Sequence, residues 1–216
     1  AEPEHSVMQG LFGSRAAMFP SASSSSVSVN GDPLYQELTD YTRMYQATYR
    51  SDSWVGDVSA YQLDADTGEV ADLPEWTAAD RLQTLDWDTG RIIATYDGSV
   101  GVPFRYDRIS TSQQQALGSD PNILNYVRGE RSNEAQYSGA FRDRFQVLGD
   151  IVHSSPVYHN GMLYAGGNDG MLHVFNAATG DEKFAYVPNL VFGNLSALAD
   201  PDYSHLFYVD QTPYAA

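Results

Sequence analysis

The sequence predicts a mainly β fold, arranged as a partial β-propeller of one or two four-stranded antiparallel blades with short helical insertions. Four short strand-like runs follow one another between residues 154 and 188: SSPVYH, GMLYAGGN, GMLHVFNA and DEKFAYVP. Short loops join them, and four consecutive antiparallel strands form one blade. A related pattern, Gly followed by alternating apolar residues, an aromatic residue and then T-G, occurs at 56–68 and at 170–180. The 15 Tyr and 9 Phe, with Gly and Pro spread along the chain, also favour short strands and tight turns.

Three parts are predicted along the chain: an extended tail at 1–30, a first incomplete blade with helical insertions at 31–148, and a blade with the start of the next at 149–216. The stretch MFPSASSSSVSVNGD is rich in Ser and nearly uncharged, which favours an extended linker. Within it SVSVN alternates polar and apolar residues. We therefore also consider a strand donor, in which Val27 and Val29 share one face and fill pockets on another sheet.

Turn chemistry and helix caps predict the elements between these parts. Residues 33–50 are expected to be extended. The segments DADTG and DWDTG, ending at Gly68 and Gly90, match a D/N-x-x-T-G turn in which Asp and Thr bond nearby backbone groups. Short helices are expected at 110–118, after a Ser cap, at 119–129, between Pro121 and Gly129, and at 191–201.

Composition excludes several classes of function. There are 28 acidic and 12 basic residues, and the net charge of −16 repels nucleic acid and anionic membrane surfaces. The absence of cysteine excludes disulfides and Cys-ligated metal centres. The sequence contains no run of about 18 apolar residues, so no transmembrane helix is predicted. The chain begins AEPEHSV, which resembles the product of signal-peptide cleavage, although the edge of an excised segment would look the same.

The acidic composition makes calcium the one cofactor worth considering. Asp64, Asp66 and Glu69 form D-x-D-x-x-E within a single loop, and hard oxygen ligands at alternating positions suit Ca²⁺. The loop offers few ligands for an ion that takes six or more. Hairpin-turn hydrogen bonding by the Asp side chains is the preferred interpretation, and no other cofactor is expected.

No catalytic residue is predicted. His153, followed by Ser154 and Ser155, lacks the G-x-S-x-G context of a nucleophile elbow, and the histidines lack metalloprotease spacing. A basic stretch contains four arginines, namely Arg128, Arg131, Arg142 and Arg144. Pairing with the nearby Glu130, Glu134 and Asp143 is the simpler interpretation, and contact with an acidic partner is the alternative.

Residues 141–195 closely resemble the propeller domain of PilY-type type IV pilus biogenesis proteins, which are tip-associated adhesins. The sequence of this stretch is FRDRFQVLGDIVHSSPVYHNGMLYAGGNDGMLHVFNAATGDEKFAYVPNLVFGNL. Three earlier segments resemble the parts that precede this domain in the family: SDSWVGDVSAYQLDADTGEV, WDTGRIIATYDGSVGVPFRY and ILNYVRGERSNE. The similarity therefore covers roughly 45–213. The resemblance implies a quinoprotein-like propeller, export, and a role in pilus assembly, retraction control or attachment. The family's calcium loop, usually well downstream of the VDxTP motif, is absent from this chain, which ends VDQTPYAA.

We therefore expect a secreted, non-enzymatic structural or adhesive protein at the bacterial surface or in an extracellular filament. It would contact pilus or filament subunits, or other copies of itself. The alternative is a fragment of a degenerate quinoprotein-like oxidoreductase, although fold likeness does not carry function. One full blade leaves open sheet edges, so the chain is either a piece of a longer protein or a short protein whose edges other copies cover.

Overall fold

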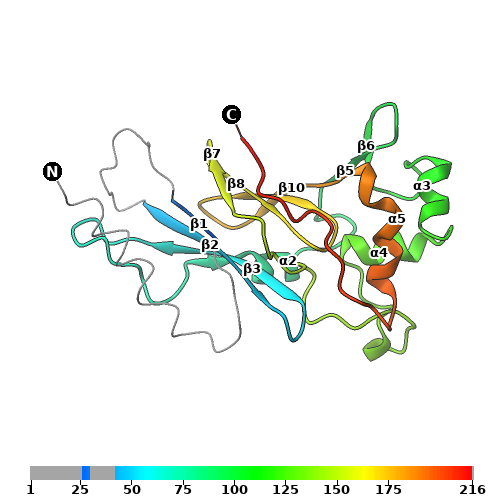
Figure 1. Cartoon of the computed structure of the whole chain (residues 1–216), viewed down its shortest axis with the longest axis horizontal. Helices are drawn as coiled ribbons and strands as arrows, with labels where there is room; N and C mark the ends of the chain where they lie inside the picture. The colour runs from blue at the N-terminus through cyan, green and yellow to red at the C-terminus, as the bar shows by residue number, and fades with distance from the viewer. Residues whose placement is uncertain (1–25, 30–41, 216) are drawn as a thin grey trace.

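The computed structural model describes residues 26–29 and 42–215, and its strands form two sheets (Figure 1). The first is antiparallel, in the order β1-β2-β3-β4, with strands at Ser26–Val29, Arg43–Arg50, Val55–Gln62 and Trp76–Thr77. The second has the order β6-β5-β10-β9-β8-β7. Its strands are β5 Ile93–Tyr96, β6 Gly101–Pro103, β7 Val157–His159, β8 Met162–Gly166, β9 Leu172–Asn176 and β10 Glu182–Val187.

The hairpin of β2 and β3 is the longest pairing in the first sheet. It runs in register over eight positions, from Arg43 opposite Gln62 to Arg50 opposite Val55. Its turn closes at Trp54, which adopts a left-handed φ of 48° that is uncommon for a bulky side chain. The extended conformation expected at 33–50 is confirmed for β2, while 33–41 lies outside the described residues.

The four strands predicted between 154 and 188 are confirmed as β7, β8, β9 and β10, paired antiparallel in that order. Asn160 and Gly161 join the first two strands with φ of 48° and 76°. Positive φ at both central residues matches the twist of a two-residue hairpin. The sequence did not predict that β10 also pairs in parallel with β5, which adds β5 and β6 to the same sheet.

A buried cluster joins the facing surfaces of the two sheets. It contains Tyr45, Ala47, Val58, Ala60, Trp76, Ala78 and Leu82 from the first sheet and the helix α2 (Ala78–Gln83), and Leu148, Ile151, Leu163, Ala165, Phe175 and Ala177 from the second sheet and its approach. The Tyr45 hydroxyl and the Trp76 indole both donate to the carbonyl oxygen of Ala177, at 3.1 and 3.3 Å. These hydrogen bonds fix the turn between β9 and β10 against the first sheet.

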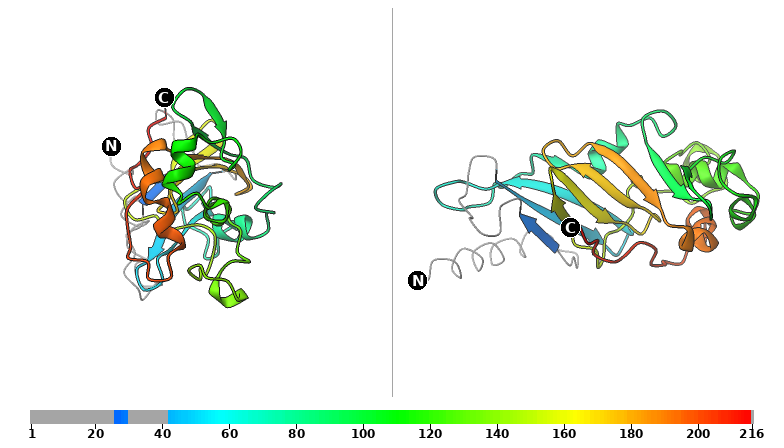
Figure 2. Two further views of the ribbon diagram at one scale, coloured as in Figure 1. Left: turned by 90° about the vertical axis from the view of Figure 1, so that its right-hand side faces the viewer. Right: turned by 90° about the horizontal axis from the view of Figure 1, so that it is seen from above.

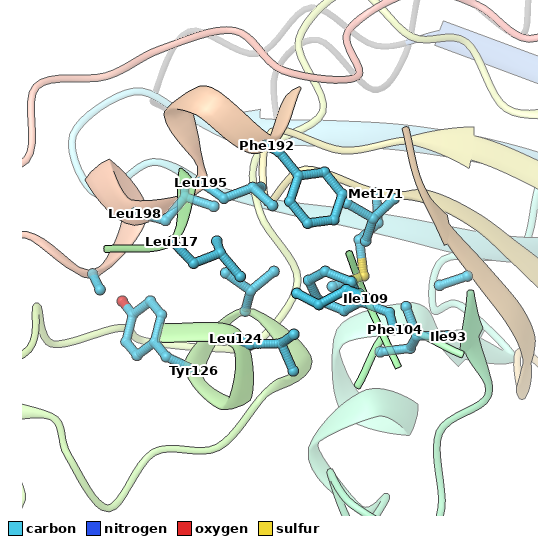
Figure 3. Close-up of a cluster of buried hydrophobic side chains, with 14 residues drawn as sticks. Ile93, Phe104, Ile109, Leu117, Leu124, Tyr126, Met171, Phe192, Leu195 and Leu198 are labelled. Atoms are coloured by element: carbon cyan, nitrogen blue, oxygen red, sulfur yellow. The ribbon is translucent and has the colours of Figure 1, made fainter. Parts of the chain in front are cut away.

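Apart from α2, the described helices gather at the end of the second sheet away from β1–β3 (Figures 1 and 2). They are α3 Thr111–Ala116, α4 Pro121–Arg128 and α5 Phe192–Leu195, with 3₁₀ turns η1 Ala135–Tyr137, η2 Asn189–Val191 and η3 Ser196–Ala199. The predicted caps are confirmed, because Ser110 and Gln113 form a capping box and Gly129 ends α4 with φ 116°. Figure 3 shows the core beneath them, where Phe192, Leu195 and Leu198 face Phe104, Leu124 and Tyr126.

The fold class is therefore mixed α/β, with one antiparallel sheet and one mixed sheet, rather than mainly β. The strands and short helical insertions agree with the sequence prediction, but the described residues form no closed ring of blades. The difference arises because β5 and β6 extend the predicted blade through a parallel pairing. Parallel neighbours come from distant parts of a chain, so turn signals do not reveal them. The proposed division at 148/149 stays a prediction, and strands from both sides of it share the second sheet.

Candidate functional site

The candidate site lies where the last described segment crosses the loop end of the second sheet. We call residues 203–212 the strap. It runs from the helical end back along the sheet to β7 (Figure 1). Except for short turns and bends it has no regular secondary structure, so side-chain contacts hold it in place.

His205 joins the strap to both sheets. Its Nε2 lies 2.8 Å from Oδ2 of Asp150, in the segment that leads into the second sheet. Its ring stacks on Trp54 at a centroid distance of 3.6 Å and an angle of 18°. Because Trp54 closes the β2–β3 hairpin, one imidazole connects that hairpin, the strap and the approach to β7.

Asn168 holds the middle of the strap from the turn between β8 and β9. Its side-chain oxygen accepts the N–H of Tyr208 at 2.9 Å, and its amide nitrogen donates to Oδ2 of Asp150 at 2.8 Å. Asn168 is only 2% exposed, and these bonds satisfy an amide that would be costly to bury alone. Asn168 therefore holds both the strap and Asp150, whose carboxylate also contacts His205.

The end of the strap runs beside residues 153–155. Oδ1 of Asp210 accepts the N–H of His153 at 3.1 Å, and the other oxygen of Asp210 contacts the His153 ring. Two residues later, Oγ1 of Thr212 accepts the N–H of Ser155 at 2.9 Å. The side chains of Asp210 and Thr212 thus accept backbone N–H groups that a neighbouring strand would accept through its carbonyl oxygens.

Glycine allows the strap to lie directly on β8. A Cβ at Gly166 would lie 2.3 Å from the carbonyl oxygen of Val209, well inside contact distance. The N–H of Gly166 donates to Oγ of the fully buried Ser154 at 2.9 Å. Ser154 therefore helps to hold β8 at the point where the strap crosses it.

A chain of buried charges lies behind the strap. Arg91 makes a two-pronged ion pair with Glu182, 2.7 Å at each contact, and both side chains are 1% exposed. His173 bridges Glu182, at 2.9 Å, and Asp169, at 3.0 Å. Burial alone would lower the pKa of His173, but Asp169 and then Glu182 raise that pKa to about 9. Burial alone would raise the pKa of Glu182, but Arg91 and then His173 lower it to about 2.

The predicted pairing of the basic stretch is confirmed for Glu134. This carboxylate binds Arg131 at 3.0 Å and Arg144 at 2.9 Å, and its side chain is fully buried. Glu130 and Asp143 instead accept backbone N–H groups, from Ser132 and Gln136 respectively.

The remaining two arginines are held by carbonyl groups. Arg128 is buried and donates to the carbonyls of Phe104, Trp87 and Asp88. Arg142 donates from Nε to the carbonyl of Leu198 and stacks on the ring of Tyr203.

The predicted calcium loop has the hydrogen bonds of a turn. Oδ1 of Asp64 accepts the N–H groups of Asp66 and Thr67 and the Thr67 hydroxyl, at 2.8–3.0 Å. These hydrogen bonds, those from Thr67 first, hold the pKa of Asp64 below its ordinary value. Among the described residues no group of three or more His, Cys, Asp or Glu could hold a metal ion. Calcium binding by Asp64, Asp66 and Glu69 stays a prediction.

The predicted donor segment is strand β1 of this chain's own first sheet. Val27 stands opposite Gln46 and Val29 opposite Met44 in an antiparallel ladder with β2. The segment thus has the extended conformation that strand donation requires. Donation to another copy stays a prediction.

Sequence reasoning missed the strap and the buried charges, since both depend on contacts between distant residues. His205 and Asp150 are 55 positions apart, and Arg91 and Glu182 are 91 apart. One signal was available in the sequence. Gly166 and Gly167 precede the polar residues Asn168 and Asp169, and glycine in a strand often marks a place where another backbone segment approaches closely. No helix among the described residues is long and apolar enough to cross a membrane.

Comparison with known proteins identifies relatives over most of the chain. A type IV pilus biogenesis factor PilY1 homolog of Xylella fastidiosa (strain Temecula1) is 34% identical over 196 residues, covering 77% of this chain. Type IV pilus biogenesis factor PilY1 of Pseudomonas aeruginosa is 30% identical, covering 78% of the chain in strain UCBPP-PA14 and 88% in strain PAK. The chain is a distant homologue of the PilY1 type IV pilus biogenesis factors. This confirms the resemblance to PilY-type proteins.

The match covers a small part of each PilY1 protein. The chain spans 15%, 18% and 20% of the length of these three relatives. No family model matches the chain. No solved structure matches it either.

Proposed function

We propose that this PilY1-related chain is part of an exported, non-enzymatic structural or adhesive protein that acts in a type IV pilus or another extracellular filament. It works through protein–protein contacts, with pilus subunits or other copies of the chain as partners. The distant homology to PilY1 type IV pilus biogenesis factors carries this proposal. The net charge of −16 supports it, because that charge disfavours nucleic acid and anionic membranes as partners.

We also propose that the two sheets are neighbouring blades of a propeller that further sheets would complete. The support is that both faces of the β7–β10 meander are apolar. Leu163, Ala165 and Phe175 are fully buried on the face toward the first sheet. A row across the opposite face is only half-buried, and its members stand in register: Val157, Tyr164, Val174 and Phe184. A sheet that is apolar on both faces is suited to packing between two neighbours.

Self-assembly by strand donation is a further part of the proposal. Among the described residues, β1 pairs with Met44–Ala47, which are four of the eight residues of β2. The same segment from another copy could form the same ladder, and a donor passed from copy to copy propagates a filament. Replacing Val27 and Val29 with Asp should then weaken polymer formation without unfolding the meander. Light scattering and electron microscopy would measure this, and a wild-type chain that stays monomeric at high concentration would refute it.

The pilus function is tested in the source bacterium. Deleting the gene should reduce the number of surface pili, and an intact copy should restore it. The protein should be found in the sheared-filament fraction, with a cytoplasmic marker absent from that fraction as the control. Normal piliation and twitching in the deletion strain, together with a cytoplasmic location, would overturn the proposal.

A further inference from the structure

A small cleft opens between the β2–β3 turn, the segment 142–150 and the start of the strap. Its volume is about 40 Å³, and its lining includes Trp54, Arg142, Phe145 and Tyr203. Phe145 is 78% exposed. A charged head group and aromatic walls therefore meet in a space that accepts one small polar group.

Arg142 and Arg144 both line the cleft, and of these two described arginines only Arg142 has no carboxylate partner. Arg131 and Arg144 share the buried carboxylate of Glu134, and Arg128 is surrounded by carbonyls. Arg142 donates from Nε to the carbonyl of Leu198 at 3.0 Å. The Arg142 side chain also interacts with the Tyr126 hydroxyl, but within the described part of the chain it forms no ion pair with a carboxylate.

Tyr203 holds the Arg142 guanidinium and adds a second donor. The guanidinium carbon lies 4.1 Å from the centre of the Tyr203 ring, which fixes the plane of the charged group. The Tyr203 oxygen accepts the N–H of Leu206 at 3.0 Å, which leaves its own hydrogen free to donate. Burial raises the pKa of Tyr203, so the hydroxyl keeps that hydrogen at neutral pH.

The carboxylates around the cleft have other partners. Asp143 accepts the N–H of Gln136, Asp150 binds His205 and Asn168, and Asp169 binds His173. None of them forms an ion pair with Arg142. The positive charge of Arg142 is therefore not neutralised locally.

We propose that this cleft binds one carboxylate of a protein partner, with Arg142 and Tyr203 donating to its oxygens. The planar guanidinium matches the two oxygens of a carboxylate, and aromatic walls suit an aliphatic stem. A phosphate dianion fits less well, because the net charge of −16 repels a second negative charge more strongly. This inference rests on the proposed function, since it names the chemistry of the partner.

Two carboxylate sources are possible, and model peptides distinguish them. Ac-Gly-Glu-Gly-NH₂ offers a side-chain carboxylate, Ac-Gly-Gly offers a terminal one, and Ac-Gly-Gln-Gly-NH₂ offers neither. Each is titrated into the ¹⁵N-labelled chain while two-dimensional NMR follows the Trp54 indole and the amides of 142–149. We expect saturable shifts with at least one acidic peptide at about millimolar affinity, and none with the neutral peptide.

Variants of the whole chain complete the test. Arg142→Gln should weaken binding at least about tenfold, because a charge-assisted pair of hydrogen bonds is lost. Arg142→Lys should keep part of the affinity, and Tyr203→Phe should weaken it less than Arg142→Gln does. The control is Arg81→Gln, which removes one exposed positive charge on α2. Absence of any shift up to about 50 mM, or equal binding by Arg142→Gln with an undisturbed spectrum, would overturn the inference. Either result would leave the proposed function standing, because that function is tested separately by the piliation of the deletion strain.

Discussion

The buried ion pair of Arg91 and Glu182 gives the sharpest test of how the second sheet is held. Arg91 also donates to the carbonyl of Arg128 at 2.6 Å, so this side chain connects β10 with the end of α4. The charges of Arg91, Glu182, His173 and Asp169 balance when all four are ionised. Replacing Glu182 with Gln removes one negative charge and leaves a buried site with a net charge of +1.

The expected cost follows from breaking a buried pair by removing one partner. Such changes typically cost about 3–5 kcal/mol, because the remaining charge stays buried without compensation. At about 2–4 °C per kcal/mol for a chain of this size, Glu182→Gln should lower Tm by about 6–20 °C. Loss of the proton from His173 would relieve part of the imbalance, so the lower half of that range is expected.

The dependence on pH identifies the mechanism. The pKa of His173 is raised from 6.5 to about 9, so the stability that its proton contributes is complete below pH 6.5 and lost as the pH rises through about 9. In Glu182→Gln, one of the two carboxylates that raise this pKa is gone, and the loss should begin at a lower pH. Thermal unfolding followed by circular dichroism between pH 6 and 10 measures both effects.

The matched control is Glu69→Gln, which removes a carboxylate from an exposed turn. It should leave Tm within about 1 °C of the original chain, as surface changes usually do. If Glu182→Gln changes Tm as little as this control, the buried pair contributes nothing net and the reasoning fails. An unchanged pH profile with a lowered Tm would instead mean that Glu182 acts only through packing.

Three further predictions use other parts of the structure. Burial raises the pKa of Asp57 from 3.8 to about 6, so stability should fall as the pH rises from 4 to 6; Asp57→Asn should remove this fall of about 2–3 kcal/mol in denaturant titrations. Gly166→Ala places a methyl group against Val209 and should cost about 1–3 kcal/mol and speed proteolysis of the strap, whereas Gly193→Ala meets nothing within 4 Å and should do neither. For calcium, we expect identical melting curves with and without chelator, and a chelator-sensitive Tm that Asp66→Ala abolishes would reverse that expectation.

Local chemistry was predictable from the sequence, and long-range partners were not. Ser110, Pro121 and Gly129 fixed helix ends because caps involve residues one to four positions apart. The four strands of the meander were predictable because short turns separate them. The parallel neighbour β5, by contrast, is about 90 residues from β10, and no local pattern encodes that pairing.

The candidate site divides in the same way. Turn bonding by Asp64 and pairing within the basic stretch involve neighbours in sequence, and both were predicted. The strap depends on His205, Asn168 and Asp210, whose partners come from other parts of the fold. Such residues look ordinary in a sequence until the chain brings them together.

The repeated D/N-x-x-T-G pattern marks a turn rather than a blade. In DADTG, DWDTG and NAATG, at 64–68, 86–90 and 176–180, the first side chain accepts the N–H groups of the third and fourth residues. The N–H of the final Gly donates to the first carbonyl in every copy, at 2.8–2.9 Å. Two copies follow antiparallel strands, but the copy at 86–90 joins α2 to β5. Because all these bonds lie within five residues, the motif folds alike in different surroundings, and its recurrence predicts local geometry without predicting which strands become neighbours.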